Sequence, residues 1–448
     1  METKIQKVEK FGQSLTLKGI LIGIMSILLL IPGAMIQELI LERQMRSKET
    51  IQKINEKWSL AQTLNGPFLV IPYQIKTVDN KNNMSIEKST LSITPEKLDI
   101  KVALTPEERH FGIYKSILYK SDISFSGHFN QPAAHFPANA EVDWAGAYFR
   151  IGISDLRGIT KDIEFKAGNM TGIADASGQT DAIGAGLRIA IDHPESLFTN
   201  GKASFSGSMK LKGSESINFV PAGKSTQVEV NGNWASPGFS GSFSPEYSIA
   251  DNKFTAKWNV LHFNRNIPEA WTDSNVKTFE DSSFGVNLVD TVDHYQQNMR
   301  SAKYAFMFIA LTFVVFFFVE VITRKKIHPV QYLLVGIALI LFYSLLLSIS
   351  EQTGFGWAYA IASVSTIALI AGYANSIFKN KKQTALLAGI LAGLYLFLYI
   401  VLQLEDIALL IGCIGLFVIL GIIMYVSGKI KWYKQEETVE NGQLTMDN

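Results

Sequence analysis

The sequence predicts a membrane protein in which a bundle of six transmembrane helices carries a large, mainly β extracytoplasmic domain, inserted between helices 1 and 2. Hydrophobic residues make up 47% of the 448 residues and charged residues only 18%, against about 25% in an ordinary soluble domain. Six stretches are long and apolar enough to cross a bilayer core of about 30 Å. Between the first two of them, the apolar periodicity changes from helical to alternating, which is typical of strands.

The predicted elements follow in this order along the chain. Residues 1–18 form a cytoplasmic N-terminus, residues 37–302 the β domain with a helical stalk at 37–58, and residues 427–448 a cytoplasmic tail. The transmembrane helices are expected at residues 19–36, 304–322, 330–349, 357–378, 385–402 and 407–426. The first span is longer than the apolar part of a signal peptide and lacks a good cleavage site. We therefore expect an uncleaved anchor, the alternative being a five-span protein.

Basic residues predict the orientation of the six spans. Thirteen of them flank the spans on one side: Lys4, Lys7, Lys10, Lys18, Arg324, Lys325, Lys326, Lys379, Lys381, Lys382, Lys429, Lys431 and Lys434. The two short loops on the other side, residues 351–356 and 403–406, contain no Lys or Arg. By the positive-inside rule, both termini are cytoplasmic and the β domain lies outside.

The extracytoplasmic segment starts as a helix and continues as strands. Glu42 with Arg46, and Glu49 with Lys53, are spaced as ion pairs along a helix. Alternation then predicts strands at residues 89–94, 121–125, 203–211, 227–230 and 254–260. The domain is expected as one lobe or as two packed lobes divided near residues 130–139. With 27 basic and 30 acidic residues in this segment, it has no charge excess suited to nucleic acid.

The spans themselves offer few polar groups. Glu320 is the one charged residue inside them, and a local ion pair with Arg324 is expected. Because a proton relay needs carboxylates or histidines at mid-depth, none is predicted. Gly389 and Gly393 form a GxxxG pattern, which indicates close packing of the fifth span against the sixth or, alternatively, a homodimer contact.

Patterns that resemble enzyme motifs are incomplete. Residues 218–225 differ from a phosphate-binding P-loop at their first position, Asn218. Ser85 and Lys88 match a four-residue serine acyltransferase pattern without its companion motifs. His128, His135 and Asp122 lack the spacing of metal ligands, and the lone Cys413, expected to be buried in span six, cannot form an intrachain disulfide. We therefore expect no catalytic residue, no cofactor and no metal site.

Several stretches in fixed order resemble the CreD family of bacterial inner-membrane proteins. They include residues 65–72, 111–114, 121–122, 154–158, 231–234, 303–305, 309–313, 328–336 and 350–355. The resemblance covers nearly the whole chain. It implies a protein of the bacterial inner (cytoplasmic) membrane with a periplasmic domain, tied to cell-envelope integrity and stress response. It supplies no catalytic residues.

Three groups within these stretches are candidate interaction or structural sites: Asp155, Arg157 and Gly158; His328 and Pro329; and Glu351, Thr353 and Gly354. An arginine beside a carboxylate predicts a bidentate pair that locks a turn, with ligand contact as the alternative. His328 and Pro329 predict a helix start, with a sensory histidine as the alternative. Glu351, in a polar outer turn, is a candidate docking point between the domain and the bundle.

The expected function is that of a non-enzymatic inner-membrane protein that supports envelope integrity or the envelope stress response. Its partners are expected to be membrane lipids and an envelope protein or cell-wall component, without nucleic acid. A transporter or channel subunit is the alternative, and an envelope-modifying enzyme is a third. Both alternatives need polar groups that the sequence provides only sparsely.

Overall fold

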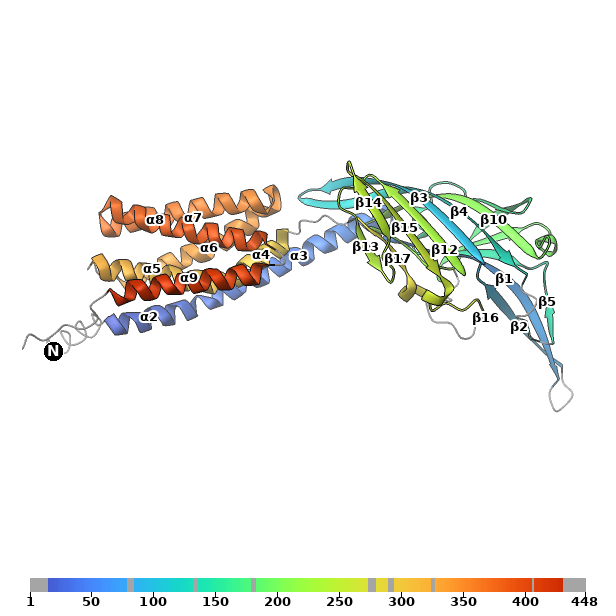
Figure 1. Cartoon of the computed structure of the whole chain (residues 1–448), viewed down its shortest axis with the longest axis horizontal. Helices are drawn as coiled ribbons and strands as arrows, with labels where there is room; N and C mark the ends of the chain where they lie inside the picture. Colours follow the sequence, from blue (N-terminus) through green and yellow to red (C-terminus); the bar gives the residue numbers. More distant parts are fainter. Residues whose placement is uncertain are drawn as a thin grey trace, which may run out of the picture. The chain divides into compact units, whose positions relative to one another are not determined.

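The computed structural model describes residues 15–78, 84–131, 136–137, 139–178, 183–272, 279–288, 294–323, 327–404 and 407–429. The chain divides into two compact units. The helical unit contains Met1–Met45 and Asp293–Asn448, and the β unit contains Arg46–Val292 (Figure 1).

Six helices among the described residues are long and apolar enough to span a membrane. The first of these runs from Leu17 to Trp58 and contains α2 (Leu15–Leu28) and α3 (Leu30–Trp58), separated by a turn at Leu29. The others are α5 (Ala305–Thr323), α6 (Pro329–Thr353), α7 (Phe355–Phe378), α8 (Lys381–Gln403) and α9 (Ala408–Gly428). These spans, with a large β unit between the first and the rest, confirm the predicted fold class.

One further helix, α4 (His294–Lys303), was not expected from the sequence, because its residues are mostly polar. It belongs to the helical unit although it lies within the segment assigned to the β domain. Asn298 is buried and donates to the Ser350 hydroxyl of α6 at 2.7 Å. Arg300 donates to the Leu404 carbonyl at 2.8 Å. These polar contacts, which strand periodicity cannot reveal, hold α4 against the spans.

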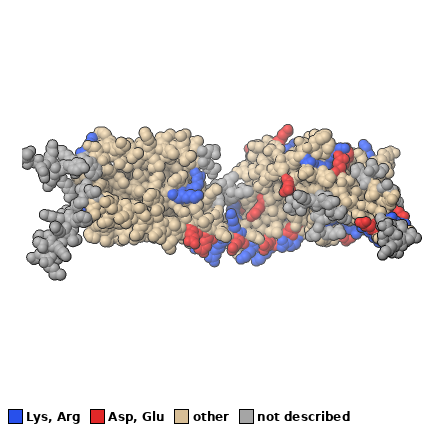
Figure 2. All heavy atoms as spheres, turned by 90° about the horizontal axis from the view of Figure 1, so that it is seen from below, with Lys and Arg blue, Asp and Glu red and all other residues tan. Residues whose placement is uncertain are grey.

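The outer surface of the helical unit is apolar. Figure 2 shows it almost free of charged side chains on the visible face, whereas charges are scattered over the β unit. α9 contributes only Ala408 to the interior of the unit. Cys413 is exposed on α9, so the expectation that it is buried was wrong. A lipid-facing helix explains this exposure, because hydrocarbon surrounds such a side chain without protein contacts.

Seventeen strands are present among the described residues of the β unit. They are β1 (Gln62–Val78), β2 (Met84–Ile93), β3 (Lys97–Phe111), β4 (Tyr114–Asn130), β5 (Ala140–Val142), β6 (Tyr148–Ile153), β7 (Glu164–Ala167), β8 (Met170–Ser177), β9 (Gly186–Ile191), β10 (Lys202–Ser214), β11 (Ser216–Phe219), β12 (Ser225–Gly232), β13 (Gly238–Gly241), β14 (Glu246–Ala250), β15 (Lys253–Leu261), β16 (Ala270–Thr272) and β17 (Phe284–Asn287). Each of the five sequence-predicted strand segments lies within or largely within one of these.

The strands form one continuous sheet. Hydrogen-bonded neighbours follow the order β14, β15, β12, β3, β4, β10, β7, β8, β9, β6, β1, β2 and β16. The pairings of β12 with β3 and of β1 with β11 are parallel, and the others are antiparallel. β1 also pairs with β5, and β11 leads on through β17 to β13. The long β1 is therefore shared by several parts of the sheet.

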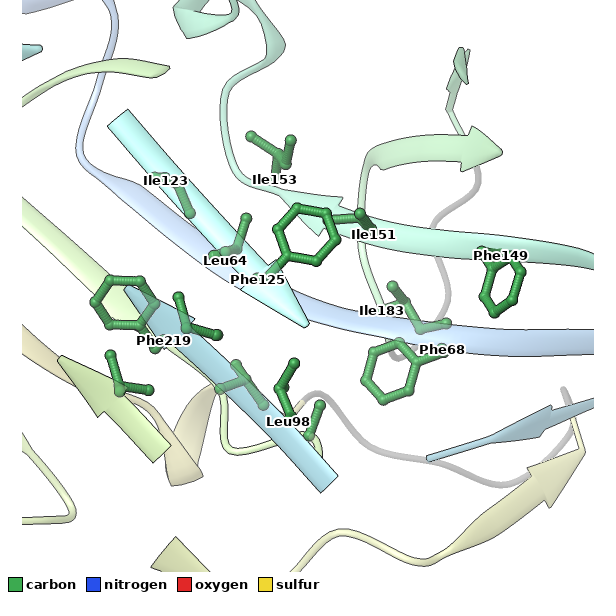
Figure 3. Packing of buried hydrophobic residues seen from close by; sticks show 14 of the residues in the cluster. Leu64, Phe68, Leu98, Ile123, Phe125, Phe149, Ile151, Ile153, Ile183 and Phe219 are labelled. Atoms are coloured by element: carbon green, nitrogen blue, oxygen red, sulfur yellow. The ribbon is translucent and has the colours of Figure 1, made fainter. Parts of the chain in front are cut away.

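A single hydrophobic core fills the β unit. Phe68, Phe149 and Phe219 are 0% exposed, and they belong to the same cluster as Leu98 and Phe125 (Figure 3). Burying each such side chain contributes about 1.5–3 kcal/mol. Because strands from both halves of the segment share this cluster, the structure supports one lobe rather than two.

Candidate functional site

The turn after β6 holds a carboxylate that joins two distant segments of the chain. The Asp155 side chain is 8% exposed. Arg157 donates Nε to its Oδ1 and Nη2 to its Oδ2, both at 2.8 Å, which is bidentate geometry. The same carboxylate accepts the Leu60 N–H at 2.9 Å and the Ser59 hydroxyl at 3.2 Å. Asp155 therefore ties its own turn to the residues that follow α3.

Arg157 and Gly158 complete this connection, which we call the α3 joint (Ser59, Leu60, Gln62, Asp155, Arg157 and Gly158). Arg157 Nη1 donates to the Glu56 carbonyl at 2.7 Å, one of the last carbonyls of α3, which lack partners within the helix. A Cβ on Gly158 would lie 2.4 Å from the Lys212 carbonyl oxygen. Only glycine fits there, so α3, the β6 turn and β10 meet closely.

The electrostatics of the α3 joint favour a structural role. Hydrogen bonds from Arg157 lower the pKa of Asp155 to about 2, outweighing the opposite effect of burial. The carboxylate is therefore ionised near neutral pH, whereas a general acid needs a pKa close to the working pH. Its oxygens are already engaged by Arg157, Leu60 and Ser59.

A second cluster at the end of α3 was missed by the sequence analysis. The Trp58 ring has the Arg109 guanidinium 4.5 Å and the Lys212 ammonium 4.3 Å from its centroid. One turn earlier, buried Asn55 accepts from the Ser116 hydroxyl at 2.6 Å and donates to Glu215 at 3.1 Å. These contacts join residues far apart in sequence. A single tryptophan at the end of a charged helix does not indicate which distant residues will contact it.

In the helical unit, a buried ion pair links α2 to α5. Glu320 is 7% exposed, and Oε1 accepts from Lys18 Nζ and from the Ile327 N–H. Its Oε2 accepts from the Tyr332 hydroxyl at 2.9 Å. The expected partner, Arg324, lies outside the described residues. The described partner comes from the other end of the chain, which helical spacing cannot predict.

His328 and Pro329 lie at the start of α6. His328 is the N-cap, its Nδ1 accepts from the Val330 N–H at 3.3 Å, and its own N–H donates to the Gln331 side chain at 2.9 Å. Pro329 is the first residue of the helix, where its missing N–H costs nothing. These contacts account for both residues as a helix cap.

Glu351, Thr353 and Gly354 lie at the turn between α6 and α7. Glu351 accepts from the Tyr295 hydroxyl of α4 at 3.1 Å, a contact within the helical unit. The Thr353 hydroxyl donates to the Ile349 carbonyl at 3.1 Å. Gly354 has φ +78° and its N–H donates to Ser350, so it adopts a conformation that side chains disfavour.

The GxxxG pattern lies on an uncovered part of α8. A Cβ added to Gly389 or Gly393 would meet nothing within 4 Å. α8 instead packs on α9 through Phe397, whose ring fills the space at Gly415. Packing between the fifth and sixth spans therefore does not use the pattern.

The incomplete enzyme motifs do not assemble into sites. Ser85 and Lys88 lie three residues apart on β2, so their side chains point to opposite faces. Asp122 and His128 lie six residues apart on β4, about 20 Å along a strand, while His135 is outside the described residues. No group of three metal-ligating side chains is present in the part of the chain that the structure describes.

The segment that resembles a P-loop leads into strand β12, where a P-loop leads into a helix. Its backbone donors are already engaged. Gly223 N–H donates to the Thr226 hydroxyl, and those of Lys224 and Ser225 donate to the carbonyls of Pro95 and Glu96. Phosphate would have to displace these bonds, so the segment is a strand connection.

Comparison with known proteins gives consistent matches over almost the entire length. The family model described as "Inner membrane protein CreD" matches residues 14–433. The inner membrane protein CreD of Escherichia coli strain K12 is 31% identical over 422 residues, which cover 91% of this chain and 91% of that protein. The similarity therefore includes both units and all six candidate spans.

Proposed function

Because the chain belongs to the CreD family of inner membrane proteins, we propose that it supports cell-envelope integrity or the envelope stress response through its β unit. In this proposal the β unit is periplasmic, both termini are cytoplasmic, and the protein acts by binding a partner or by organising the membrane. It is a multi-pass inner-membrane protein without an enzymatic step.

The observation that carries this proposal is the size and internal unity of the β unit. Residues 46–292 share one core and are inserted directly after the first membrane span. If the function required only the membrane-spanning helices, a folded β unit of this size would not be needed. The α3 joint attaches the end of that first span's helix to the sheet through Arg157 and Asp155.

The proposed orientation rests on the basic flanks of the spans. Lys18 precedes most of the first apolar segment, and Lys379, Lys381 and Lys382 lie at the connection of α7 with α8. All are on one side if the six helices span in sequence, and basic residues favour the cytoplasmic side. The β unit then lies on the opposite side.

The envelope role predicts a strong effect when the β unit is removed. Replacing residues 62–287 with a flexible Gly/Ser linker keeps α2 to α9 but should make cells as permeable as cells lacking the protein. Uptake of a membrane-impermeant dye under detergent stress measures this. The Ser85→Ala variant is the matched control and should exclude dye as the natural protein does. Dye exclusion by the truncated protein, once shown to be in the membrane, would contradict the role of the β unit.

The orientation predicts which residues a membrane-impermeant maleimide reaches in intact spheroplasts. In a Cys413→Ala background, Ser206→Cys on β10 should be labelled, because it would face the periplasm. Lys381→Cys should be labelled only after the membrane is permeabilised. The reverse pattern would place the β unit in the cytoplasm.

Partners of this protein are proposed from its surfaces. The β unit would bind an envelope protein or a cell-wall component, and lipids would surround the apolar helices. The uncovered face of α8 around Gly389 and Gly393 would suit close approach of a second copy. The balanced charge argues against nucleic acid as a partner.

A further inference from the structure

A groove lies on the exposed face of four neighbouring strands in the β unit. Strands β12, β3, β4 and β10 run side by side there (Figure 1). Along β3, β4 and β10, residues that point into the core alternate with residues exposed on this face. The groove has a volume of about 370 Å³, which lies within the range of small-molecule sites.

Short side chains form the floor of this groove. Ala103 lies on β3, Ser124 on β4 and Ser208 on β10. Longer charged side chains stand around them, which makes the face hollow at this point. The Ser208 hydroxyl donates to Glu164 at 3.5 Å. The Ser124 hydroxyl makes no hydrogen bond within the part of the chain that the structure describes, so it is available to a ligand.

The two ends of the groove carry opposite charge. A row of directly paired residues crosses the groove from Lys101 on β3, by way of β4 and β10, to Glu164 on β7. Three strand spacings separate these two residues, about 14 Å. Next to Glu164, Lys161 and Asp162 complete the far end. Since Lys161 pairs with Glu164 at 3.4 Å, this end keeps one excess negative charge.

Ion pairs inside the groove leave one charge free at each end. Lys210 and Asp122, which lie between the ends, pair with each other at 3.0 Å. Lys101 and Asp162 make no ion pair with any other residue that the structure describes. The groove is therefore neutral in total, with a free ammonium group at one end and a free carboxylate at the other.

A ligand with one carboxylate and one ammonium group matches this arrangement. A simple anion would meet the excess negative charge at the far end, and a neutral sugar would leave both free charges without a partner. An extended peptide advances at most about 3.3–3.6 Å per residue. Two or three residues therefore span the part of the groove that the Lys101 and Asp162 side chains do not fill.

We propose that the groove binds a short peptide with free ends, its carboxylate against Lys101 and its amino group against Asp162. The Ser124 hydroxyl then bonds a peptide group above the floor. The proposal rests on the proposed function, in which the β unit binds an envelope protein or a cell-wall component. It specifies that component as a short peptide of the wall.

The test titrates the full chain, purified in detergent micelles, with tri-alanine by isothermal titration calorimetry. Tri-alanine acetylated at its amino end and tri-alanine amidated at its carboxyl end are the matched ligands. We expect free tri-alanine to bind, and each blocked form to bind about three- to tenfold more weakly. This range corresponds to the loss of one charge-assisted ion pair that is partly solvated.

Variants of the groove assign each end of the peptide. Lys101→Met should weaken the binding of free tri-alanine by about three- to tenfold, without weakening that of the amidated form any further. Asp162→Asn should behave in the same way towards free and acetylated tri-alanine. Combining the variants with the blocked ligands in this manner isolates each contact. Lys253→Met, which removes an exposed lysine of β15 outside the groove, is the matched control and should leave the affinity unchanged.

Two results would overturn the proposal. The first is equal affinity for free and blocked tri-alanine, or binding of neither. The second is an affinity of Lys101→Met and Asp162→Asn that equals that of the Lys253→Met control. Because binding is measured on the purified protein, failure here leaves the envelope role to be judged by dye uptake in cells with the truncated chain.

Discussion

Replacing Glu320 with alanine is expected to lower the free energy of unfolding of the helical unit by about 3–5 kcal/mol. The substitution removes the acceptor of Lys18, Ile327 and Tyr332. Lys18 has a side chain only 17% exposed, so its charge would remain largely buried without a counter-charge. Unfolding of the purified protein by increasing fractions of sodium dodecyl sulfate in mixed micelles measures the loss.

A double-mutant cycle separates the ion pair from the other bonds of Glu320. Glu320→Gln keeps one acceptor oxygen, for the Ile327 N–H, and presents an NH2 donor to the Tyr332 oxygen, but it leaves the Lys18 charge unpaired. Adding Lys18→Met removes that charge, and the double variant should regain most of the lost stability. If Glu320→Gln and Lys18→Met were each harmless, the pair would contribute nothing to the unit.

Asp155→Ala is expected to destabilise the β unit by about 3 kcal/mol, because charge-assisted hydrogen bonds contribute roughly 1.5–3 kcal/mol each and neighbouring losses are not additive. Arg157 would lose both of its hydrogen bonds to the carboxylate, and the Leu60 N–H would lose its acceptor. Since Arg157 is 55% exposed, water compensates for part of its loss. Urea unfolding followed by tryptophan fluorescence measures the difference. The matched control, Asp122→Ala, removes an exposed carboxylate and should change stability by less than about 0.5 kcal/mol.

The pH dependence of the free energy of unfolding provides a second measure of how much Asp155 stabilises the β unit. Because the pKa of Asp155 is lowered from 3.8 to about 2 in the folded protein, its contribution is complete above the ordinary pKa and is lost as the pH falls towards 2. Asp155→Asn should show a shallower loss of stability between about pH 4 and pH 2. Equal acid sensitivity of the two proteins would show that the pair does not stabilise the β unit.

The membrane spans could be predicted from the sequence because a bilayer requires about 20 consecutive apolar residues in a helix. The strands could be predicted because a half-buried strand alternates apolar and polar residues. Which strands pair with one another could not be predicted from the sequence. β1 bonds β11 through Gln62 and Ile217, which are far apart in the chain, and alternation does not specify which strand lies alongside. The polar helix α4 was missed for a related reason, since its burial depends on Ser350 and Leu404, both distant in sequence.

In the candidate site, too, contacts between residues close in sequence could be predicted, and contacts between distant residues could not. Asp155 and Arg157 are two residues apart, so their pairing follows from local geometry. The connection from Asp155 to Leu60, and from Arg157 to Glu56, depends on the fold. Lys18 and Glu320 are 302 residues apart, whereas helical spacing indicates only a partner within four residues, such as Arg324. The cations around Trp58 come from β3 and β10, which the sequence analysis had no means of bringing together.

The many pairings of β1 have a consequence for biogenesis. β1 is the first strand made, yet β11, one of its neighbours, is completed by β17 near residue 287. At translation rates of about 5–20 residues per second, roughly 10 to 45 seconds separate the synthesis of these strands. During that time β1 can pair with β2, β5 and β6, but its parallel pairing with β11 is incomplete until β11 has been joined by β17. Sheets dominated by such non-local pairing fold slowly, so we expect nascent chains to need a chaperone that shields the part of β1 that pairs with β11, Gln62 to Leu64, until the last strand arrives.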